Sequence, residues 1–479
     1  MKQTIEVKNQ RYRLGYHITA PAGWINDPNG FCYFKGYYHI FYQHHPYSAD
    51  WGPMHWGHAI SKDLINWEHL PIALYPDENG TIFSGCVVVD WDNTSGFFDN
   101  EPGLVAIYTS FYKEHHSESS LQRQSLAYSR DNGRTWIKYE GNPVLSDEGF
   151  TDFRDPKVFW HNETERWVMV LAVAESIRIY TSVNLKVWEY ASEFRRPPTL
   201  HRGVWECPDL IKFPVDGDID NEKWVLIISV GGSEPIDETS KIYYFIGDFD
   251  GKTFKYSNPT NPVLQLDYGW DNYAAGSWSN VPNEKKIYIG WMSNWHYANQ
   301  VPTESWRGSM TLPRELSLIS TNKGMRLLQK PVESIVNLYK ESIRHENFTV
   351  YSNSPETVTL NHLLYKINVE FEKVDSELFG LQIHTTHNEK ITIGYDVKKS
   401  RLYLDRTESG KTEFSPYFPL VMSAPVDLIS NKIKLELYVD TSSIEVFVNN
   451  GEQTITSLIF PCSTKGNLKL FSEQGDTKV

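Results

Sequence analysis

The sequence predicts an all-β protein, a five-bladed β-propeller followed by a C-terminal β-sandwich. Three observations support this: a recurring turn that ends on an aromatic residue, almost no helical periodicity before residue 330, and no tryptophan after Trp306. The 479 residues include 16 Trp, 28 Tyr and 23 Phe, and aromatic side chains are enriched in strands. We expect the propeller over 1–325, a linker over 326–340 and the sandwich over 341–479.

The recurring turn predicts the blades. Each copy follows a short apolar strand and places Asp or Asn, which hydrogen-bond their own backbone, ahead of an aromatic residue. The copies lie at 61–67, 129–136, 181–188 and, more weakly, 247–254. A strand-turn-aromatic unit repeated at roughly 40 to 70 residues is typical of propeller blades. The alternative is that a β-rich chain simply repeats Asp-Gly turns.

Single strands can be placed in chain order. Segments 31–34 and 37–43 flank Lys35-Gly36 and predict a hairpin. Apolar runs at 167–174 and 224–230 predict fully buried strands, and 330–342 predicts a short helix or linker. Beyond them, strict alternation predicts the sandwich. Its clearest example is the strand with Ile433, Leu435, Leu437 and Val439 on one face.

Composition excludes several classes of protein. A net charge of −14 disfavours nucleic acid as a partner. The longest apolar run is far shorter than the roughly 20 residues of a membrane-spanning helix, so we expect no membrane partner. Four widely spaced cysteines form neither a disulfide framework nor a zinc site. The polar start predicts a cytoplasmic protein as written, or a secreted one if a signal peptide was removed. Oligomeric state is not predicted.

Three acidic residues stand in similar surroundings: Asp27, Asp155 and Glu206. Each lies beside or near an aromatic residue and is followed within two residues by Pro. Because Pro restricts its own backbone and that of the preceding residue, it fixes the direction of a nearby carboxylate. For any one motif the alternative is a capped turn. Three such motifs in one chain favour a reactive site.

A pair of carboxyl groups in different environments is what glycoside hydrolysis requires. One attacks or supports the anomeric carbon, and the other protonates the leaving oxygen. Trp205 and Cys207 give Glu206 weakly polar flanks, which favours a general acid. We expect Asn26 and Arg154 to keep Asp27 and Asp155 ionised.

The three motifs, in this order, resemble those of glycoside hydrolase family 32, and the resemblance covers essentially the whole chain. They are Trp24-x-Asn26-Asp27-Pro28-Asn29-Gly30, Arg154-Asp155-Pro156 and Glu206-Cys207-Pro208. The resemblance implies a five-bladed propeller with a sandwich. It also implies release of terminal non-reducing β-D-fructofuranosyl units from sucrose, fructo-oligosaccharides or fructans such as levan and inulin. Segments 51–58, 70–76 and 301–307 resemble the levanase and exo-inulinase branch, and microbial invertases share parts of them.

The resemblance also implies residue roles. Asp27 would be the nucleophile, Glu206 the acid/base and Asp155 the transition-state stabiliser. The implied substrate-binding residues are Asn26, Gln43, Trp51, Phe83, Ser84, Arg154 and Trp291. A covalent intermediate implies retention of configuration, for which carboxyl separations of roughly 5 to 5.5 Å are typical. No cofactor or metal is expected, because two carboxyl groups suffice.

Alternatives remain open at this point. A histidine group (His44, His45, His55 and His58) suggests a metal, but no H-E-x-x-H motif and no Asp or Cys completes a ligand set. We therefore favour packed or hydrogen-bonding histidines. A fructosyltransferase would use the same acids, and a non-catalytic fructan-binding protein would use the same fold. The tryptophan-free sandwich is interpreted as support for the site.

Overall fold

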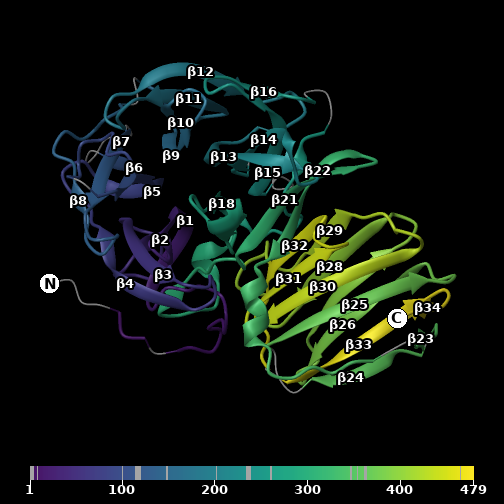
Figure 1. The fold of residues 1–479 in the computed structure, drawn as a ribbon. Helices are drawn as coiled ribbons and strands as arrows, with labels where there is room; N and C mark the ends of the chain where they lie inside the picture. The colour runs from purple at the N-terminus through teal and green to yellow at the C-terminus, as the bar shows by residue number, and fades with distance from the viewer. Residues whose placement is uncertain are drawn as a thin grey trace.

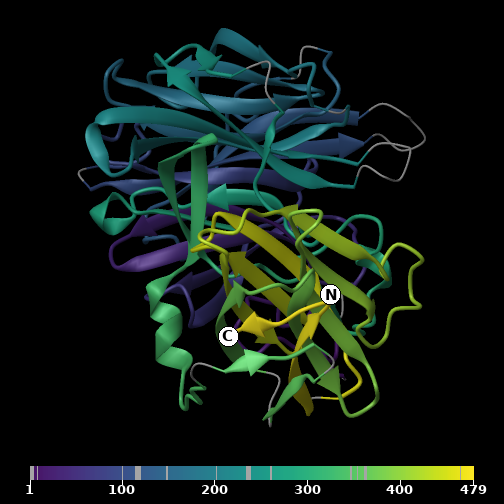
Figure 2. The same ribbon diagram turned by 90° about the vertical axis from the view of Figure 1, so that its right-hand side faces the viewer.

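The computed structural model describes residues 5–7, 9–99, 101–113, 120–146, 149–200, 202–232, 239–258, 262–345, 348–352, 354–360, 364–463 and 465–479. Nearly all of its regular structure is β, as predicted. Strands up to Pro331 form a ring, and a two-sheet sandwich lies against the edge of that ring (Figure 1). The view turned by 90° shows the same two bodies packed together (Figure 2).

Four sheets form the ring. The first, in the order β20-β1-β2-β3-β4, comprises β20 (Trp306–Arg307), β1 (Gly23–Phe34), β2 (Tyr37–His45), β3 (His55–Ser61) and β4 (Trp67–Leu74). The second comprises β5 (Thr81–Asp90), β6 (Gly103–Lys113), β7 (Ser120–Ser129) and β8 (Ile137–Lys138). The third comprises β9 (Phe153–His161), β10 (Arg166–Val173), β11 (Ser176–Ser182) and β12 (Glu189–Arg195).

The fourth sheet has nine strands. Its first antiparallel group comprises β13 (Trp205–Val215), β14 (Asp218–Val230), β15 (Lys241–Phe249), β16 (Phe254–Tyr256) and β17 (Leu264–Gln265). Its second comprises β18 (Tyr273–Ser277), β19 (Lys286–Trp291), β21 (Arg314–Thr321) and β22 (Gly324–Pro331). A single parallel pair, Val215 with Leu318, joins the two groups. The innermost strands β1, β5, β9, β13 and β18 neighbour one another in a closed cycle around the centre of the ring (Figure 1).

The repeat found in the sequence occupies one position in the ring. Each copy connects the third and fourth strands of a group: β3 to β4, β7 to β8, β11 to β12 and β15 to β16. In each, an Asp or Asn oxygen accepts backbone N–H groups, as Asp63 does from Asn66 at 2.8 Å and Asp250 from Thr253 at 2.7 Å. In the first three copies the Trp indole also donates to a turn carbonyl, as Trp188 does to Leu185 at 2.8 Å. These turns therefore fix the outer edge of each group.

Several local predictions are confirmed. Phe34 pairs with Tyr37 across Lys35 and Gly36, whose positive φ values of 45° and 90° suit a two-residue hairpin turn. The predicted buried strands correspond to β10 and β14. Three short 3-10 helices occur in the described residues: η1 (Pro282–Glu284), η2 (Ala298–Gln300) and η3 (Glu333–Leu338). None of the helices in the described ranges is long and apolar enough to cross a membrane.

Two six-stranded sheets form the sandwich. The first comprises β23 (Thr349–Val350), β34 (Thr477–Lys478), β25 (Tyr365–Lys373), β30 (Lys432–Asp440), β31 (Ser443–Val448) and β32 (Gln453–Leu458). The second comprises β24 (Glu356–Leu360), β33 (Gly466–Glu473), β26 (Leu378–Thr385), β27 (Lys390–Asp396), β28 (Arg401–Glu408) and β29 (Val421–Pro425). The alternating face of β30 predicted from the sequence lies in the apolar core of this unit.

Buried charges join the ring to the sandwich. Arg314 on β21 donates to Glu445 on β31 at 2.5 Å and to Asp267 at 3.1 Å. His17 contacts Asp440 at 2.7 Å and Glu445 at 2.8 Å. Burial lowers the pKa of His17, but the two carboxylates outweigh it and raise the pKa to about 9. The five side chains thus form one buried network across the junction.

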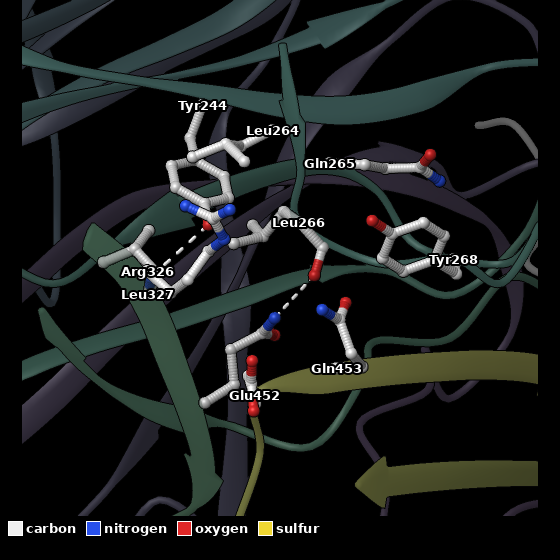
Figure 3. A pocket seen from close by; sticks show the side chains of 10 residues that line it. Tyr244, Leu264, Gln265, Leu266, Tyr268, Arg326, Leu327, Glu452 and Gln453 are labelled. Carbon is white, nitrogen blue, oxygen red and sulfur yellow. Dashed lines mark hydrogen bonds between the residues drawn. The ribbon is translucent and has the colours of Figure 1, made fainter. Parts of the chain in front are cut away.

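A small polar cavity also lies at this junction (Figure 3). The backbone N–H of Leu327 donates to the hydroxyl of Tyr244 at 3.4 Å, and Gln329 donates to the carbonyl of Leu266 at 2.5 Å. The cavity measures about 20 Å³, which suits a water molecule but not a sugar.

Loss of Arg314 should destabilise the fold strongly. Arg314→Met leaves Asp267 buried without its cation and Glu445 with His17 alone, and breaking a buried pair in this way typically costs about 3 to 5 kcal/mol. The matched control is Lys323→Met, because Lys323 pairs with Asp427 across the same junction but both are exposed. We expect the control to change the free energy of unfolding by less than about 1 kcal/mol. Equal losses of Tm in the two variants would contradict the central role of the buried network.

Candidate active site

The five innermost strands share a break in pairing near the centre of the ring. In each strand the register with its neighbour shifts, which marks a β-bulge or a related irregularity. The residues inside these shifts are 26–27 on β1, 83–84 on β5, 155–156 on β9, 207–208 on β13 and 274–275 on β18. Bulges redirect side chains and are frequent beside active sites. All three sequence-predicted acids lie in or beside them.

Asp27 is held by donors from two strands. Ser84 Oγ donates to Asp27 Oδ2 at 2.7 Å, and Asn26 Nδ2 donates to Asp27 Oδ1 at 3.0 Å. Trp24 in turn donates to Asn26 at 2.7 Å, which fixes the amide. Burial and the charge of Glu206 raise the pKa of Asp27, while the hydrogen bonds lower it. The donors therefore counteract burial and favour the carboxylate.

Asp155 is the most buried of the three acids, with 5% of its surface exposed. The backbone N–H of Cys207 donates to its Oδ2 at 3.0 Å. Burial raises the pKa of Asp155 to about 7 although Arg154 lowers it, and Glu206 and Asp27 raise it further. Asp155 has φ +62° and Cys207 has φ +47°, so both contacts depend on left-handed backbone.

Glu206 lies between a cation and a phenol. Arg154 Nη2 donates to Glu206 Oε1 at 3.0 Å, and the Tyr273 hydroxyl donates to Oε2 at 2.5 Å. This differs from the expected environment of Trp205 and Cys207, because Trp205 points away and stacks on Phe245. Arg154 also forms the expected ion pair with Asp155, with Nε 3.9 Å from Oδ2, and it lowers the pKa of that carboxyl group. Its shorter contacts go to Glu206 and Asp152.

Cys207 connects the acids. Its thiol lies 3.6 Å from Asp27 Oδ2 and 3.7 Å from Asp155 Oδ2. Burial and the three carboxylates raise the pKa of the thiol, so Cys207 is a neutral, weak donor. The carboxyl groups of β1 and β9 therefore converge on one side chain of β13.

The predicted pocket residues divide into two groups. Asn26, Ser84 and Arg154 contact the acids directly. The remaining four contact none of the acids through a hydrogen bond of the described residues: Gln43, Trp51, Phe83 and Trp291. Gln43 and Trp291 are buried, and each keeps a side-chain N–H without a hydrogen-bond partner in this part of the chain. Trp51 is 44% exposed and donates its backbone N–H to Asn299 at 3.1 Å.

Sequence reasoning missed three side chains. Tyr273 holds Glu206, and Asp152 orients Arg154 at 2.5 Å. Trp295, 39% exposed, stacks on Trp24 and lies 4.7 Å from Trp291 between ring centres. Trp295 extends the aromatic wall outward. Of the three, only Trp295 could have been found from the sequence, because it lies four residues after the predicted pocket residue Trp291.

The buried histidines near the site form hydrogen bonds. His44 contacts the Trp24 carbonyl at 2.8 Å, and His39 contacts His58 at 3.1 Å. Burial lowers the pKa of His44 to about 4, so it stays neutral near pH 7. Within the described ranges, no group of three or more His, Cys, Asp or Glu is arranged to hold a metal.

Comparisons with known proteins cover nearly the whole chain. Residues 17–331 match the model described as Glycosyl hydrolases family 32 N-terminal domain, and residues 334–479 match Glycosyl hydrolases family 32 C terminal. A levanase of Bacillus subtilis (strain 168) is 49% identical over 478 residues, which cover 98% of this chain and 70% of that protein. An extracellular exo-inulinase of Aspergillus awamori is 38% identical over 505 residues, covering 98% and 93%.

Solved structures show the same fold. The crystal structure of exo-inulinase from Aspergillus awamori has a TM-score of 0.91 at 37% identity and covers 98% of this chain and 97% of its own. The β-fructofuranosidase from Schwanniomyces occidentalis complexed with fructosyl-erythritol has a TM-score of 0.86 at 30% identity, covering 99% and 98%.

Removing the charge of Asp155 should stabilise the protein near neutral pH. A carboxyl group whose pKa is raised on folding loses stability as pH rises from its unfolded value of about 4 toward 7. Asp155→Asn keeps the shape and tolerates positive φ. We expect its free energy of unfolding to exceed that of the wild type by on the order of 2 kcal/mol at pH 7, and by much less at pH 4. Denaturant titrations at both pH values measure this.

The control for Asp155→Asn is Asp250→Asn. Backbone donors in its turn lower the pKa of Asp250, so its charge stabilises the fold above about pH 4 and its loss should give no gain at pH 7. An equal gain for Asp155→Asn at both pH values would rule out ionisation as the cause.

Proposed function

The chain belongs to glycosyl hydrolase family 32, and we propose that it is a retaining β-fructosidase. It releases terminal non-reducing β-D-fructofuranosyl units from sucrose, fructo-oligosaccharides or fructans. The observation that carries this proposal is the convergence of Asp27, Asp155 and Glu206, each with its own strongest hydrogen-bond donor, although Asp27 and Asp155 share the weak Cys207 thiol. Different partners allow one carboxyl group to act as a nucleophile and another as an acid.

Asp27 is proposed as the nucleophile. Its oxygens accept from Ser84 and Asn26, which orient the carboxylate toward the ring centre. In the first step a new bond forms between an Asp27 oxygen and C2 of the fructosyl unit, and the bond from C2 to the leaving oxygen breaks. The product is a covalent fructosyl ester.

Glu206 is proposed as the acid and then the base. In the first step it gives its proton to the leaving oxygen. In the second step a water attacks C2, its proton goes to Glu206, and the ester bond to Asp27 breaks. Tyr273 and Arg154 hold both oxygens of Glu206, so the group is positioned for both transfers. Two inversions at C2 give overall retention.

Asp155 is proposed to bind fructose hydroxyls and to stabilise positive charge at the sugar ring. Cys207 N–H and the thiol both point at its Oδ2, which leaves Oδ1 available to the sugar. A carboxyl group whose pKa is near 7 can accept or share a hydroxyl proton as charge develops. Its effect is therefore largest in the transition state.

The aromatic wall is proposed to bind the sugar faces. Trp295 is 39% exposed and packs against the buried Trp291, which shares an apolar cluster with Phe83. Trp51 is also exposed. The levanase and exo-inulinase relatives are named for polymeric fructans, and the exo-inulinases are named extracellular. These names support a fructan outside the cell as the substrate and secretion of the protein.

Initial rates on sucrose, inulin and levan, measured side by side, test the function and rank the substrates. We expect free fructose as the main product from all substrates that are cleaved. Fructose released as the β-anomer, followed by NMR before mutarotation, would support retention. Predominantly longer oligosaccharides at high sucrose would identify a transferase instead, and no cleavage of any fructoside would reject the proposal.

Replacing Glu206 should separate its role from that of Asp27. Glu206→Ala should reduce kcat on sucrose by about 1,000-fold or more, because the leaving oxygen then lacks a proton donor. An aryl β-fructoside with an acidic phenol needs little protonation, so a fructosyl-enzyme should form and accumulate as a burst of phenol. Asp27→Asn should abolish that burst.

The control for these variants is Glu222→Ala, an exposed carboxylate on β14, which should retain wild-type kcat. A normal rate on sucrose for Glu206→Ala would remove Glu206 from the acid role. An adduct found on another residue would reassign the nucleophile.

A further inference from the structure

A second layer of polar residues lies beneath the catalytic acids. Lys157 on β9 donates its ammonium to Asp209 Oδ2 on β13 at 3.0 Å and to the Ser277 carbonyl on β18 at 2.6 Å. Ser277 donates its backbone N–H and its hydroxyl to the same Asp209 oxygen, at 2.7 and 2.6 Å. Three of the five inner strands are joined by these three side chains.

This layer shares a cavity of about 30 Å³ with Asp155, one of the three acids. Its lining includes Asp155, Ser84 and Cys207 from the catalytic layer and Lys157 and Asp209 from the layer beneath. The carboxylate of Asp209 is 2% exposed, and its Oδ1 is buried without a hydrogen-bond partner among the described residues. The charge of Asp209 therefore depends on Lys157 for its compensation.

We propose that Lys157 and Asp209 are a positioning pair that keeps the floor of the active site electrically neutral and holds β9, β13 and β18 in register under the acids. The proposal rests on the proposed function for its catalytic meaning. The pair touches no reacting atom. It acts through Asp155, which lies two residues from Lys157, and through Glu206, which lies three residues from Asp209 on the same strand.

The charges around the acids explain why neutrality matters. The inner strands contribute Asp27 from β1, Arg154 and Asp155 from β9, Glu206 and the Cys207 thiol from β13, and the Tyr273 hydroxyl from β18. The Cys86 thiol of β5 faces the Lys157–Asp209 pair, and burial raises its pKa, so it is neutral. Asp152 adds a further carboxylate beside Arg154. Three catalytic carboxyl groups thus share one arginine. A further uncompensated charge beneath them would change how readily they ionise, because buried charges interact strongly.

The two halves of the pair should have opposite effects. Lys157→Met leaves the Asp209 carboxylate uncompensated, so Asp27 and Asp155 ionise less readily and the acid limb of the pH-rate profile moves to higher pH. Asp209→Asn leaves the ammonium uncompensated, so the acid limb moves to lower pH. We expect each shift to be about 0.5 to 1 pH unit, measured as kcat/KM on the best fructoside. A purely structural ion pair would reduce both rates without opposite shifts.

Two controls separate charge from geometry. Ser277→Ala removes one donor to Asp209 without changing any charge, so we expect a lower kcat with the acid limb within about 0.2 pH unit of wild type. The double variant Lys157→Met with Asp209→Asn is neutral, and its limb should return toward that of the wild type. A double variant shifted as far as either single variant would overturn the proposal.

Stability supplies a readout that needs no substrate. Asp27 and Asp155 ionise with difficulty in the folded protein, so Tm should fall as pH rises from 5 to 7. Lys157→Met should steepen this fall, and Asp209→Asn should flatten it. Equal slopes of Tm against pH in both variants would reject the pair as an electrostatic element.

If the dependence of Tm on pH differs between the variants as expected but the wild type cleaves no fructoside, the proposed function fails, while the electrostatic role of the Lys157–Asp209 pair is still supported. If one single variant does not fold, the other and the double variant decide.

Discussion

The active site depends on a break in β-pairing that recurs in five strands. A regular strand alternates its side chains between two faces, so adjacent residues cannot serve one site. The register shifts at 26–27, 83–84, 155–156, 207–208 and 274–275 remove that restriction where the inner strands meet. Because these strands neighbour one another around the centre, five local irregularities become one site. The left-handed residues Asp155, Cys207 and Ala274 provide part of the required curvature.

Electrostatics imposes a second constraint. Three carboxyl groups that approach a common centre disfavour one another's charge, and burial adds to this cost. The protein offsets the cost unequally. Asp27 receives two side-chain donors, Glu206 receives a guanidinium and a phenol, and Asp155 receives a backbone N–H and a thiol. Because the three groups have different donors, their environments differ, as the proposed roles of nucleophile, acid and stabiliser require.

Sequence patterns predicted what is local and missed what the fold brings together. The turn repeat was visible in the sequence because the donor and acceptor of each hydrogen bond lie only a few residues apart, as Thr135 and Asp131 do. It failed in the fifth group, where the turn from β21 to β22 has no aromatic residue. Adjacency predicted that Arg154 acts on Asp155, but it did not predict the hydrogen bond from Arg154 to Glu206, which lies 52 residues away. Tyr273 lies 67 residues from Glu206, and no spacing rule relates them.

The sandwich contributes to the site without entering it. Arg406, fully buried on β28, donates to the Tyr297 hydroxyl at 2.8 Å and to Asp271 at 2.5 Å. Tyr297 adjoins η2, whose Asn299 holds the backbone of Trp51, and lies two residues from Trp295. A sandwich arginine therefore fixes the loop that carries one rim tryptophan and anchors the other. A charged side chain suits this task because its hydrogen bonds to Asp271 and Tyr297 are charge-assisted and directional, so they fix the position of an aromatic residue in the ring.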